Sequence, residues 1–389
     1  MSKTVEDKTT EYIIEHDEGA AVPDLNALAW PEQFDAIHWR EGFDDEQRAL
    51  RESIWSLKSQ LDSIDIKVYT ELRNRLFPLA RSGEQHHFSN RAGHKLMQAM
   101  QATGVWEHLR TLLPAPRKRA RGGRGPAPKR PGDTVAFADI CGGPGAFAQA
   151  LLAQCRYYNL HMKGYGITLA GVEGLDWYPE LLRRGFTPTY GIDGTGDVFK
   201  LANLEALASL TAASNLLLAV ADGGFNVGFD VANYQETIST RITFGQWLAA
   251  LKVLRPGGSF VLKLFDTFSP NSRALLFLST FIYERVHIVK PKHSRVVNSE
   301  RYLVCVNYRA LPDGWMQFFD TYYEKGFPDN DHSALLIPTS LMQRDARFTD
   351  GVREMNDAIA ARQKVALQMI IDAAASPPTA VEAVAPPPS

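Results

Sequence analysis

The segment F-A-D-I-C-G-G-P-G-A-F, from Phe137 to Phe147, constrains the fold of this 389-residue chain more than any other stretch. A short apolar run from Val135 to Ile140 predicts a buried strand, and the apolar spacing from Ala146 to Cys155 predicts a helix. The glycines between them let the backbone turn sharply and approach a ligand closely, and the start of the helix presents free N–H groups. A strand, a glycine turn and a helix in this order predict a site for a nucleoside-like ligand.

The glycine turn also allows a second interpretation, a dinucleotide site, because Gly143, Gly145 and Ala148 match the fingerprint G-x-G-x-x-A. Such a site requires an acidic residue about 20 positions further on, at the end of the next strand. The next predicted strand, Tyr165 to Leu169, has no acidic residue at its end, and Glu173 lies beyond it. An NAD-dependent enzyme is therefore the weaker interpretation, and the turn by itself specifies a ligand class but no reaction.

Composition limits the classes of partner. The formal net charge is −2, so an RNA-binding surface would be local rather than spread over the whole molecule. Cys141, Cys155 and Cys305 lack C-x-x-C spacing and the histidines lack metal-ligand spacing, so we expect no metal site and a reducing compartment. The acidic, polar first thirty residues, and the lack of an apolar run of membrane-spanning length, predict a soluble, unsecreted protein without a membrane partner.

Downstream of the glycine turn, apolar strands alternate with amphipathic helices. The predicted strands are residues 215–221, 259–264, 285–289 and 301–308, and the predicted helices are residues 238–251 and 271–282. This alternation predicts an α/β fold with a mostly parallel, doubly wound sheet of the Rossmann-like type. Ligands of such sheets bind outside the carboxyl ends of the strands, where we expect Asp139, Asp222 and Lys263 to lie.

The chain divides into a central domain with an extension at each end. Residues 1–80 form an N-terminal arm and helical extension, in which apolar residues at three- and four-residue steps from Asp44 to Leu79 predict one or two amphipathic helices. Residues 81–310 form the central domain, and residues 311–374 form a partly helical C-terminal extension. We expect the N-terminal helices to pack on the central domain and the tail, residues 375–389, to be disordered.

A basic insertion interrupts the central domain at residues 114–133. It contains seven basic residues and many prolines and glycines, and apart from proline it has no apolar residue larger than alanine. This composition predicts a flexible loop. Its charges suit contact with RNA phosphates or a nuclear import signal. A hydrated insertion without either role is an equally good interpretation, because short basic runs match such signals often.

Seven segments of the chain together resemble the RrmJ/FtsJ-type methyltransferases and, within them, the cap-specific mRNA 2'-O-ribose methyltransferases. The segments are N-R-A-G-H-K (90–95), D-I-C-G-G-P-G-A-F (139–147), K-G-Y-G-I-T-L (163–169), I-D-G-T-G-D-V (192–198), A-D-G-G-F (221–225), L-K-L-F-D (262–266) and K-P-K-H-S-R-V-V-N-S-E-R-Y (290–302). The last segment is more similar to the cap enzymes than to the bacterial rRNA enzymes. One departure is Ala146, where relatives commonly have a second glycine. The resemblance implies a class I methyltransferase fold and S-adenosylmethionine as the cofactor.

The resemblance implies a catalytic tetrad of Lys95, Asp222, Lys263 and Glu300. A ribose 2'-hydroxyl is a poor nucleophile at neutral pH, so the enzyme has to orient it and remove its proton. We expect Lys263 to take the proton, with Lys95 lowering the Lys263 pKa through like charge and contacting the hydroxyl. Asp222 and Glu300 would orient the two amines, although carboxylates also raise a lysine pKa, so the tetrad's main task could be geometric.

The resemblance also implies two sets of binding residues. The predicted cofactor residues are Asp139, Cys141, Gly142, Gly143, Pro144, Gly145, Phe147, Thr168, Asp197 and Asp222, with the acid at 197 expected to accept from the adenine amino group. The predicted RNA contacts are Arg91, Lys290, Lys292, Arg295, Asn298 and Arg301. A methylated guanine carries positive charge and favours aromatic faces, but the motifs do not indicate which aromatics it would contact.

The activity expected from these motifs is methyl transfer to the ribose 2'-oxygen of an early transcribed nucleotide of capped mRNA or another capped RNA. The first nucleotide, giving cap 1, is the leading choice, and a later one, giving cap 2 or beyond, stays open. The alternatives are an rRNA or tRNA ribose methyltransferase and, from another class, a nonenzymatic RNA-binding module on an inactive methyltransferase, which the filled tetrad disfavours. We further expect a nuclear location and contacts with capping or transcription machinery through the terminal extensions.

Overall fold

The computed structural model describes residues 8–25, 35–79, 88, 90–113, 134–225 and 227–376. Within the described residues no helix is long and apolar enough to cross a membrane. The predicted flexible insertion at 114–133, and nearly all of the predicted disordered tail, lie outside this part of the chain.

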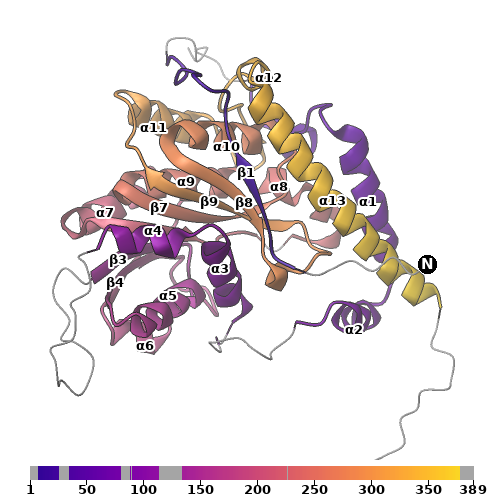
Figure 1. The fold of residues 1–389 in the computed structure, drawn as a ribbon, viewed down its shortest axis with the longest axis horizontal. Coiled ribbons are helices and arrows are strands. Elements are labelled where there is room, and N and C mark those ends of the chain that lie inside the picture. The colour runs from indigo at the N-terminus through magenta and orange to yellow at the C-terminus, as the bar shows by residue number, and fades with distance from the viewer. Residues whose placement is uncertain are drawn as a thin grey trace, which may run out of the picture.

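One eight-stranded sheet forms the centre of the molecule, with strand order β1-β8-β9-β7-β6-β3-β4-β5 (Figure 1). The strands are β1 (Thr10–Ile14), β3 (Thr134–Ile140), β4 (His161–Ile167), β5 (Phe186–Thr189), β6 (Leu216–Ala221), β7 (Leu254–Phe265), β8 (Tyr283–Lys290) and β9 (Glu300–Tyr308). Strands β5, β4, β3, β6 and β7 pair in parallel, whereas β9 is antiparallel to both of its neighbours. The predicted doubly wound, mostly parallel sheet is therefore confirmed.

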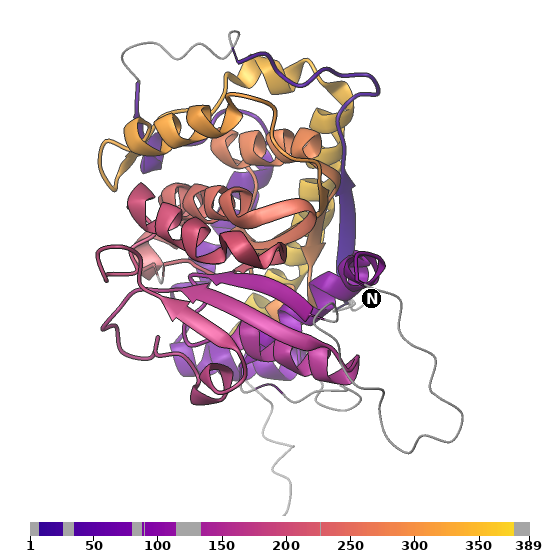
Figure 2. The ribbon, with the colours of Figure 1, turned by 90° about the vertical axis from the view of Figure 1, so that its left-hand side faces the viewer.

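Helices cover both faces of the sheet (Figure 2). The helices of the central domain are α3 (Arg91–Ala102), α4 (Val105–Thr111), α5 (Ala146–Tyr157), α6 (Pro179–Leu182), α7 (Leu201–Thr211), α8 (Gln235–Ile238), α9 (Thr240–Val253) and α10 (Pro270–Ile282). Helices α3, α4 and α5 share one hydrophobic core with the strands, and α7, α9 and α10 share the other. Residues of β6 such as Leu217 and Ala219 contribute to opposite cores, which explains why this strand is apolar at every position.

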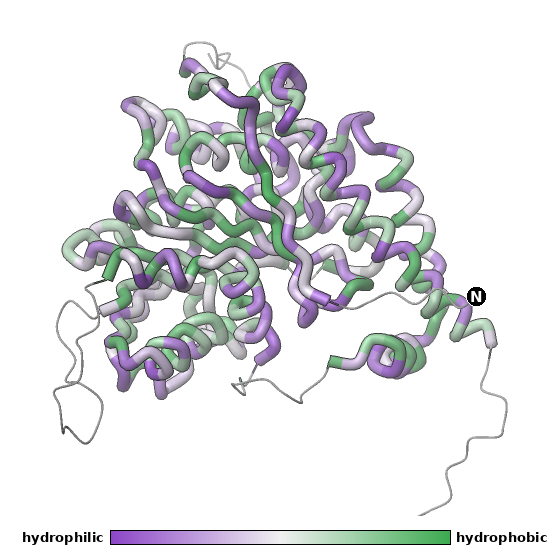
Figure 3. Tube along the Cα trace, viewed as in Figure 1, coloured by the Kyte–Doolittle hydropathy of each residue, from purple (hydrophilic) through white to green (hydrophobic). Residues whose placement is uncertain are grey.

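The terminal extensions form a third core beside the carboxyl ends of β7 and β8. It joins α1 (Arg48–Leu61) and α2 (Ile66–Leu76) to the long helix α13 (Ala346–Ala375), and it includes Phe268, Val296 and Val297 of the central domain. Along α13 the chain alternates between hydrophilic and hydrophobic residues (Figure 3), as expected for a helix with one buried face. The predicted amphipathic helices at both ends are confirmed, and α11 (Trp315–Lys325) and α12 (Thr339–Gln343) complete the C-terminal extension.

The N-terminal arm contains a strand that the sequence did not predict. Residues Thr10–Ile14 pair with β8 in an antiparallel register, and the Arg362 side chain on α13 donates a 3.0 Å hydrogen bond to Thr10 Oγ1. Five residues are too few to show a clear period of two among acidic neighbours, so only the pairing partner reveals the strand. A smaller correction concerns β4, which ends at Ile167, so that Leu169 is exposed beyond it.

Candidate active site

The four predicted tetrad residues come from four elements that meet at the carboxyl ends of the central strands. Lys95 lies on α3, Asp222 directly follows β6, Lys263 is near the end of β7, and Glu300 begins β9. Because Ala221 pairs with Leu262 in adjacent parallel strands, the residues that follow them, Asp222 and Lys263, are neighbours. Strand β9 runs antiparallel to β7 and pairs Tyr302 with Lys263, which brings the start of β9 to the same edge.

Lys95 and Glu300 form a close ion pair. The Lys95 amine lies 2.7 Å from Glu300 Oε1 and 2.8 Å from Oε2, and both side chains are nearly buried. The Tyr302 hydroxyl donates a 2.8 Å hydrogen bond to Glu300 Oε1. Burial by itself would raise the pKa of Glu300, but the Lys95 charge and these hydrogen bonds outweigh it and hold the pKa below its usual value. Glu300 is therefore ionised at neutral pH and fixes the Lys95 amine.

Lys263 and Asp222 form the second pair. The Lys263 amine donates a 2.5 Å hydrogen bond to the Asp222 backbone oxygen and lies 3.3 Å from Asp222 Oδ1. Burial raises the pKa of Asp222, while the charges of Lys263 and Lys95 oppose this and that of Glu300 adds to it. Asp222 Oδ1 accepts no hydrogen bond from the described residues. The four charged groups thus act on one another electrostatically, and Asp222 Oδ1 is buried beside the Lys263 amine.

The glycine turn after β3 has space for glycine only. A Cβ on Gly142 would lie 2.1 Å from Asp139 Oδ1, and one on Gly143 would lie 2.5 Å from the Leu175 backbone oxygen. Gly145 has a φ of +105°, a conformation that side-chain-bearing residues rarely adopt, and begins α5. The turn therefore packs so closely against Asp139 and the Leu175 backbone that only glycine fits at these positions.

Two predicted cofactor residues prove to be supports inside the protein. Asp139 is fully buried, and its Oδ2 accepts a 3.1 Å hydrogen bond from the Ala148 N–H at the start of α5. Burial raises the pKa of Asp139 well above its usual range. Phe147 is only 1% exposed and packs in the core near Tyr302. The expectation of direct cofactor contact is therefore wrong for both residues, because their side chains hold the turn from beneath.

The start of the glycine turn lies against the segment that carries Asp222. A Cβ on Gly223 would lie 2.7 Å from Cys141 Cβ, so the glycine turn touches the segment that carries Asp222. Burial raises the pKa of the Cys141 thiol to about 12, with Asp139 first among the nearby charges, followed by Lys263 and Asp197. Cys141 is therefore a neutral thiol between the tetrad and the predicted adenine acid.

Thr168, Asp197 and Pro144 are further predicted cofactor residues. The Thr168 Oγ1 atom lies 2.7 Å from the position of a Cβ on Gly143, so the threonine borders the glycine turn. Asp197 is half-buried and accepts a 2.9 Å hydrogen bond from the Phe199 N–H through Oδ1. Pro144 is also half-buried, and its backbone oxygen accepts from the Tyr178 N–H at 2.9 Å. Asp197 and Pro144 are accessible enough to contact a cofactor, whereas Thr168 is only 3% exposed and supports the turn from within.

Three of the predicted RNA contacts are buried, and the prediction of phosphate contact is wrong for them. Arg301 is 1% exposed and donates to Asp266 Oδ1 at 2.6 Å. Lys290 is 4% exposed, and its amine donates to the backbone oxygens of Asn298 and, at 2.7 Å, of Glu300. Arg295 is 7% exposed and donates to Asn74 Oδ1 on α2 at 2.8 Å. Their charges hold the loop before β9 in place instead of facing solvent.

The remaining predicted RNA contacts are accessible. Arg91 is exposed on the first turn of α3, and Lys292 and Asn298 are half-buried in the loop between β8 and β9. The Asn298 side-chain amide donates to the Ser294 backbone oxygen at 2.9 Å, which fixes its orientation. These three positions stay available for contact with a polyanion.

A cavity of about 580 Å³ opens next to Glu300, and no pattern in the sequence predicted it. It is lined by Lys58, Leu61, Asp62, Ile64, Ile66 and Tyr69 of the α1–α2 region, Ala232 and Gln235, Phe265, residues 297–300, and Leu367 of α13. This volume is in the range of small-molecule and nucleotide sites. Sequence reasoning missed it because an apolar stripe on α1 and α2 is usually explained by packing, and the other lining residues are far away along the chain.

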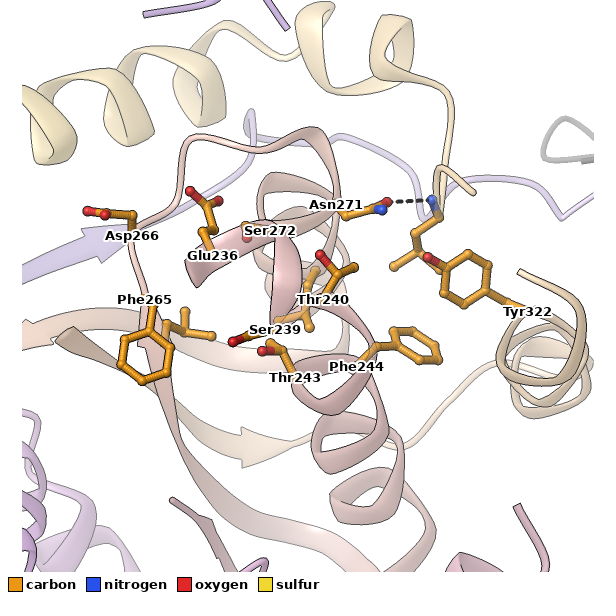
Figure 4. A pocket seen from close by; sticks show the side chains of 13 residues that line it. Glu236, Ser239, Thr240, Thr243, Phe244, Phe265, Asp266, Asn271, Ser272 and Tyr322 are labelled. Atoms are coloured by element: carbon orange, nitrogen blue, oxygen red, sulfur yellow. Dashed lines mark hydrogen bonds between the residues drawn. The ribbon is translucent and has the colours of Figure 1, made fainter. Parts of the chain in front are cut away.

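A second, much smaller cavity lies behind the end of β7 (Figure 4). Its volume is about 20 Å³, enough for roughly one water molecule. Glu236 on its wall accepts hydrogen bonds from the Phe268 and Ser269 N–H groups at 3.1 and 2.7 Å, and Asn271 accepts from the Leu336 N–H at 2.9 Å. These contacts order the loop after β7 and leave no room for a cofactor. Across the described ranges, no group of three or more His, Cys, Asp or Glu side chains could hold a metal ion.

Comparison with known proteins gives a consistent result. The family model described as FtsJ-like methyltransferase matches residues 88–308. Three similar proteins carry the name cap-specific mRNA (nucleoside-2'-O-)-methyltransferase 1. That of Leishmania braziliensis is 55% identical over 96% of this chain and 92% of its own length. Those of Trypanosoma cruzi and Trypanosoma brucei brucei are 53% and 47% identical, over 94% and 97% of this chain and 98% of their own lengths.

Proposed function

Because this chain belongs to the FtsJ-like methyltransferase family and uses S-adenosylmethionine, we propose that it methylates the ribose 2'-oxygen of the first transcribed nucleotide of capped mRNA, giving cap 1. The observation that carries the proposal is the convergence of Lys95, Asp222, Lys263 and Glu300 beside the glycine turn. The shared name of three relatives that match nearly the whole chain supports the choice of capped mRNA.

The residues present fit S-adenosylmethionine, which supplies the methyl group on a positively charged sulfur. The methionine part would lie along the glycine turn, whose backbone carries no side chain at Gly142, Gly143 and Gly145. Asp197 would accept from the adenine amino group. The Asp222 carboxylate, which pairs with Lys263, would lie near the sulfonium charge.

In the proposed reaction the chain's own residues orient the nucleophile and take up its proton. The 2'-oxygen would form a bond to the methyl carbon as the carbon–sulfur bond breaks, its electron pair staying on the sulfur of the departing S-adenosylhomocysteine. The hydroxyl proton passes to the Lys263 amine, which must be neutral when it accepts. Lys95, held by Glu300 at 2.7 Å, would donate to the same oxygen and fix its line of attack. Asp222 would keep Lys263 in place through the 2.5 Å bond to its backbone oxygen.

The cavity beside Glu300 would hold the methylated guanine of the cap. Two aromatic side chains, Tyr69 and Phe265, line it, and Asp62 adds a carboxylate on its wall. A ring with positive charge favours aromatic faces and a nearby acid. Because Glu300 belongs to both the cavity and the tetrad, a guanine bound there would leave the first transcribed nucleotide, joined to it through the triphosphate of the cap, to reach the two lysines.

The direct test uses matched capped and uncapped RNAs with labelled S-adenosylmethionine. We expect label on the 2'-oxygen of the first transcribed nucleotide of the capped RNA, located by nuclease digestion and mass spectrometry. Equal labelling of uncapped RNA would favour the rRNA or tRNA alternative, and label on a later nucleotide would favour cap 2 or beyond. Label on a base would overturn the tetrad mechanism.

A nuclear location, with contacts to capping or transcription machinery, fits the proposed substrate. Fluorescent tagging of the full chain and of a variant lacking residues 117–130 tests it. Loss of nuclear signal with unchanged activity would assign the basic insertion to import. Loss of RNA affinity with unchanged location would assign it to RNA binding.

A further inference from the structure

Helix α13 lies outside the matched family domain, yet it buries two amide side chains beside the tetrad. Asn356 is 1% exposed and Gln363 is fully buried. They are seven residues apart, so they lie on the same face of the helix. Buried amides are costly unless they are hydrogen-bonded, so their partners are informative.

Asn356 joins the end of β7 to the start of β9. Its Oδ1 accepts from the Thr267 hydroxyl at 2.7 Å and from the Arg301 guanidinium at 2.9 Å, and its Nδ2 donates to the Thr267 backbone oxygen at 3.2 Å. Thr267 is four residues after Lys263, and Arg301 directly follows Glu300. One side chain therefore contacts both segments that carry a catalytic residue.

Gln363 acts on the other side of Glu300. Its Nε2 donates a 3.0 Å hydrogen bond to the backbone oxygen of Val297, in the loop that leads to β9. Val297 also lines the large cavity. The two amides of α13 thus restrain the chain on both sides of Glu300.

The buried guanidinium of Arg301 requires several hydrogen-bond partners. Its guanidinium is paired with Asp266 at 2.6 Å, and Nε donates to the Ser299 backbone oxygen at 3.2 Å. Arg301 Nη1 also donates to Thr267 Oγ1 at 3.1 Å. Without Asn356, Nη1 would lose its shorter 2.9 Å bond and depend mainly on Thr267, so the buried guanidinium would hold the loop less firmly. A helix that served only for packing would not need an amide at this position.

We infer that Asn356 and Gln363 are positioning residues for methyl transfer, through which helix α13 fixes Lys263 and Glu300 relative to each other. This inference rests on the proposed function for its kinetic consequence. The C-terminal extension is then part of the active-site framework and not an independent appendage.

The experiment compares Asn356→Ala, Asn356→Asp and Gln363→Ala with the control Gln368→Ala in the full-length protein. Gln368 is exposed on the same helix and bonds only locally, to Asp372. We expect Asn356→Ala to lower kcat by on the order of 10- to 100-fold, the scale of a small misplacement, with S-adenosylhomocysteine affinity unchanged. Asn356→Asp should recover only part of the loss, because one carboxylate oxygen still accepts from Thr267 and Arg301 while the other faces the Thr267 backbone oxygen without a proton to donate.

Hydrogen exchange gives a readout that does not depend on the substrate. Asn356→Ala should speed exchange of the amides in 262–268 and 296–302, and Gln363→Ala only that in 296–302, whereas the control changes neither. The inference would be overturned if Asn356→Ala left both the exchange rates and kcat unchanged. It would also be overturned if the loss of kcat were fully explained by the share of the variant protein that is unfolded. Wild-type inactivity on capped RNA would instead count against the proposed function, while the exchange pattern still decides the positioning role.

Discussion

The amine of Lys95 lies 2.7 Å from Oε1 of Glu300, although 205 positions separate the two residues. The contact closes the active site, because Lys95 is held by a helix and Glu300 by a strand from the other end of the domain. A neighbouring hydroxyl, that of Tyr302, shares the same carboxylate oxygen. The position of one amine therefore depends on a carboxylate that is itself fixed from two directions.

Replacing Glu300 by glutamine should lower turnover by about 10²-fold, at the lower end of effects seen for proton-transfer groups. The neutral amide cannot hold Lys95 by charge, so the amine would lose its fixed orientation. Tyr302→Phe removes only the 2.8 Å hydrogen bond and should have a smaller effect. Turnover rates of both variants at saturating cofactor test whether Glu300→Gln loses more activity than Tyr302→Phe. A larger loss for Tyr302→Phe would contradict the prediction.

Replacing Lys263 by methionine should reduce kcat by at least about 10²-fold while cofactor affinity stays the same. The reason is that Lys263 is the proposed proton acceptor and contacts Asp222, not the glycine turn. Lys252→Met is a matched control, since Lys252 pairs with Asp320 at 2.7 Å on another part of the domain. Single-turnover rates and calorimetry with S-adenosylhomocysteine provide the measurement, and near-normal turnover would remove Lys263 from the mechanism.

Replacing Gly143 by alanine should weaken S-adenosylhomocysteine binding by at least about tenfold, or 1.4 kcal/mol. The added Cβ would lie 2.5 Å from the Leu175 backbone oxygen, so the turn would have to shift. Gly351→Ala in α13 is the control, because a Cβ there meets nothing within 4 Å. It should stabilise the helix by up to about 1 kcal/mol without changing cofactor affinity. Equal affinities for the two variants would argue against the proposed cofactor site.

The pH dependence of stability should report on Lys290. Burial lowers the pKa of Lys290 to about 7 in the folded protein, although the nearby charge of Glu300 opposes this. Between pH 7 and about 10 the unfolded chain binds a proton that the folded protein has lost, so wild-type stability gains with rising pH from this residue. Lys290→Met removes that gain. Denaturant unfolding of both proteins at several pH values measures it, and parallel curves would show that the lysine keeps its usual pKa.

Replacing Tyr69 by alanine should raise the KM for capped RNA by roughly 5- to 100-fold, equivalent to about 1 to 3 kcal/mol of base stacking. Tyr69 lines the large cavity, so its loss would remove one aromatic face without touching the tetrad. Val68→Ala, at an exposed neighbouring position, serves as the control. Steady-state kinetics would measure the KM of each variant for capped and for uncapped RNA. An equal rise in both KM values would exclude a role of Tyr69 in cap recognition.

The sequence predicted the central fold well because its signals are local. The glycine turn, the apolar runs of β3 and β6 and the amphipathic stripes of α1 and α13 are each readable within a dozen or so residues. Strand β1 escaped because five residues among acidic neighbours show no period, and its existence depends on pairing with β8.

What the sequence by itself determined was which residue types carry the chemistry, namely the tetrad residues Asp222, Lys263 and Glu300 at strand ends and Lys95 on a helix. Only the tertiary structure decided which charges reach solvent. Lys290, Arg295 and Arg301 have the composition of an RNA-binding segment, but the extensions and the loop before β9 bury them. The large cavity likewise combines residues as distant as Lys58 and Leu367. The physical reason is that accessibility and pocket shape depend on long-range packing, which no local pattern of side chains records.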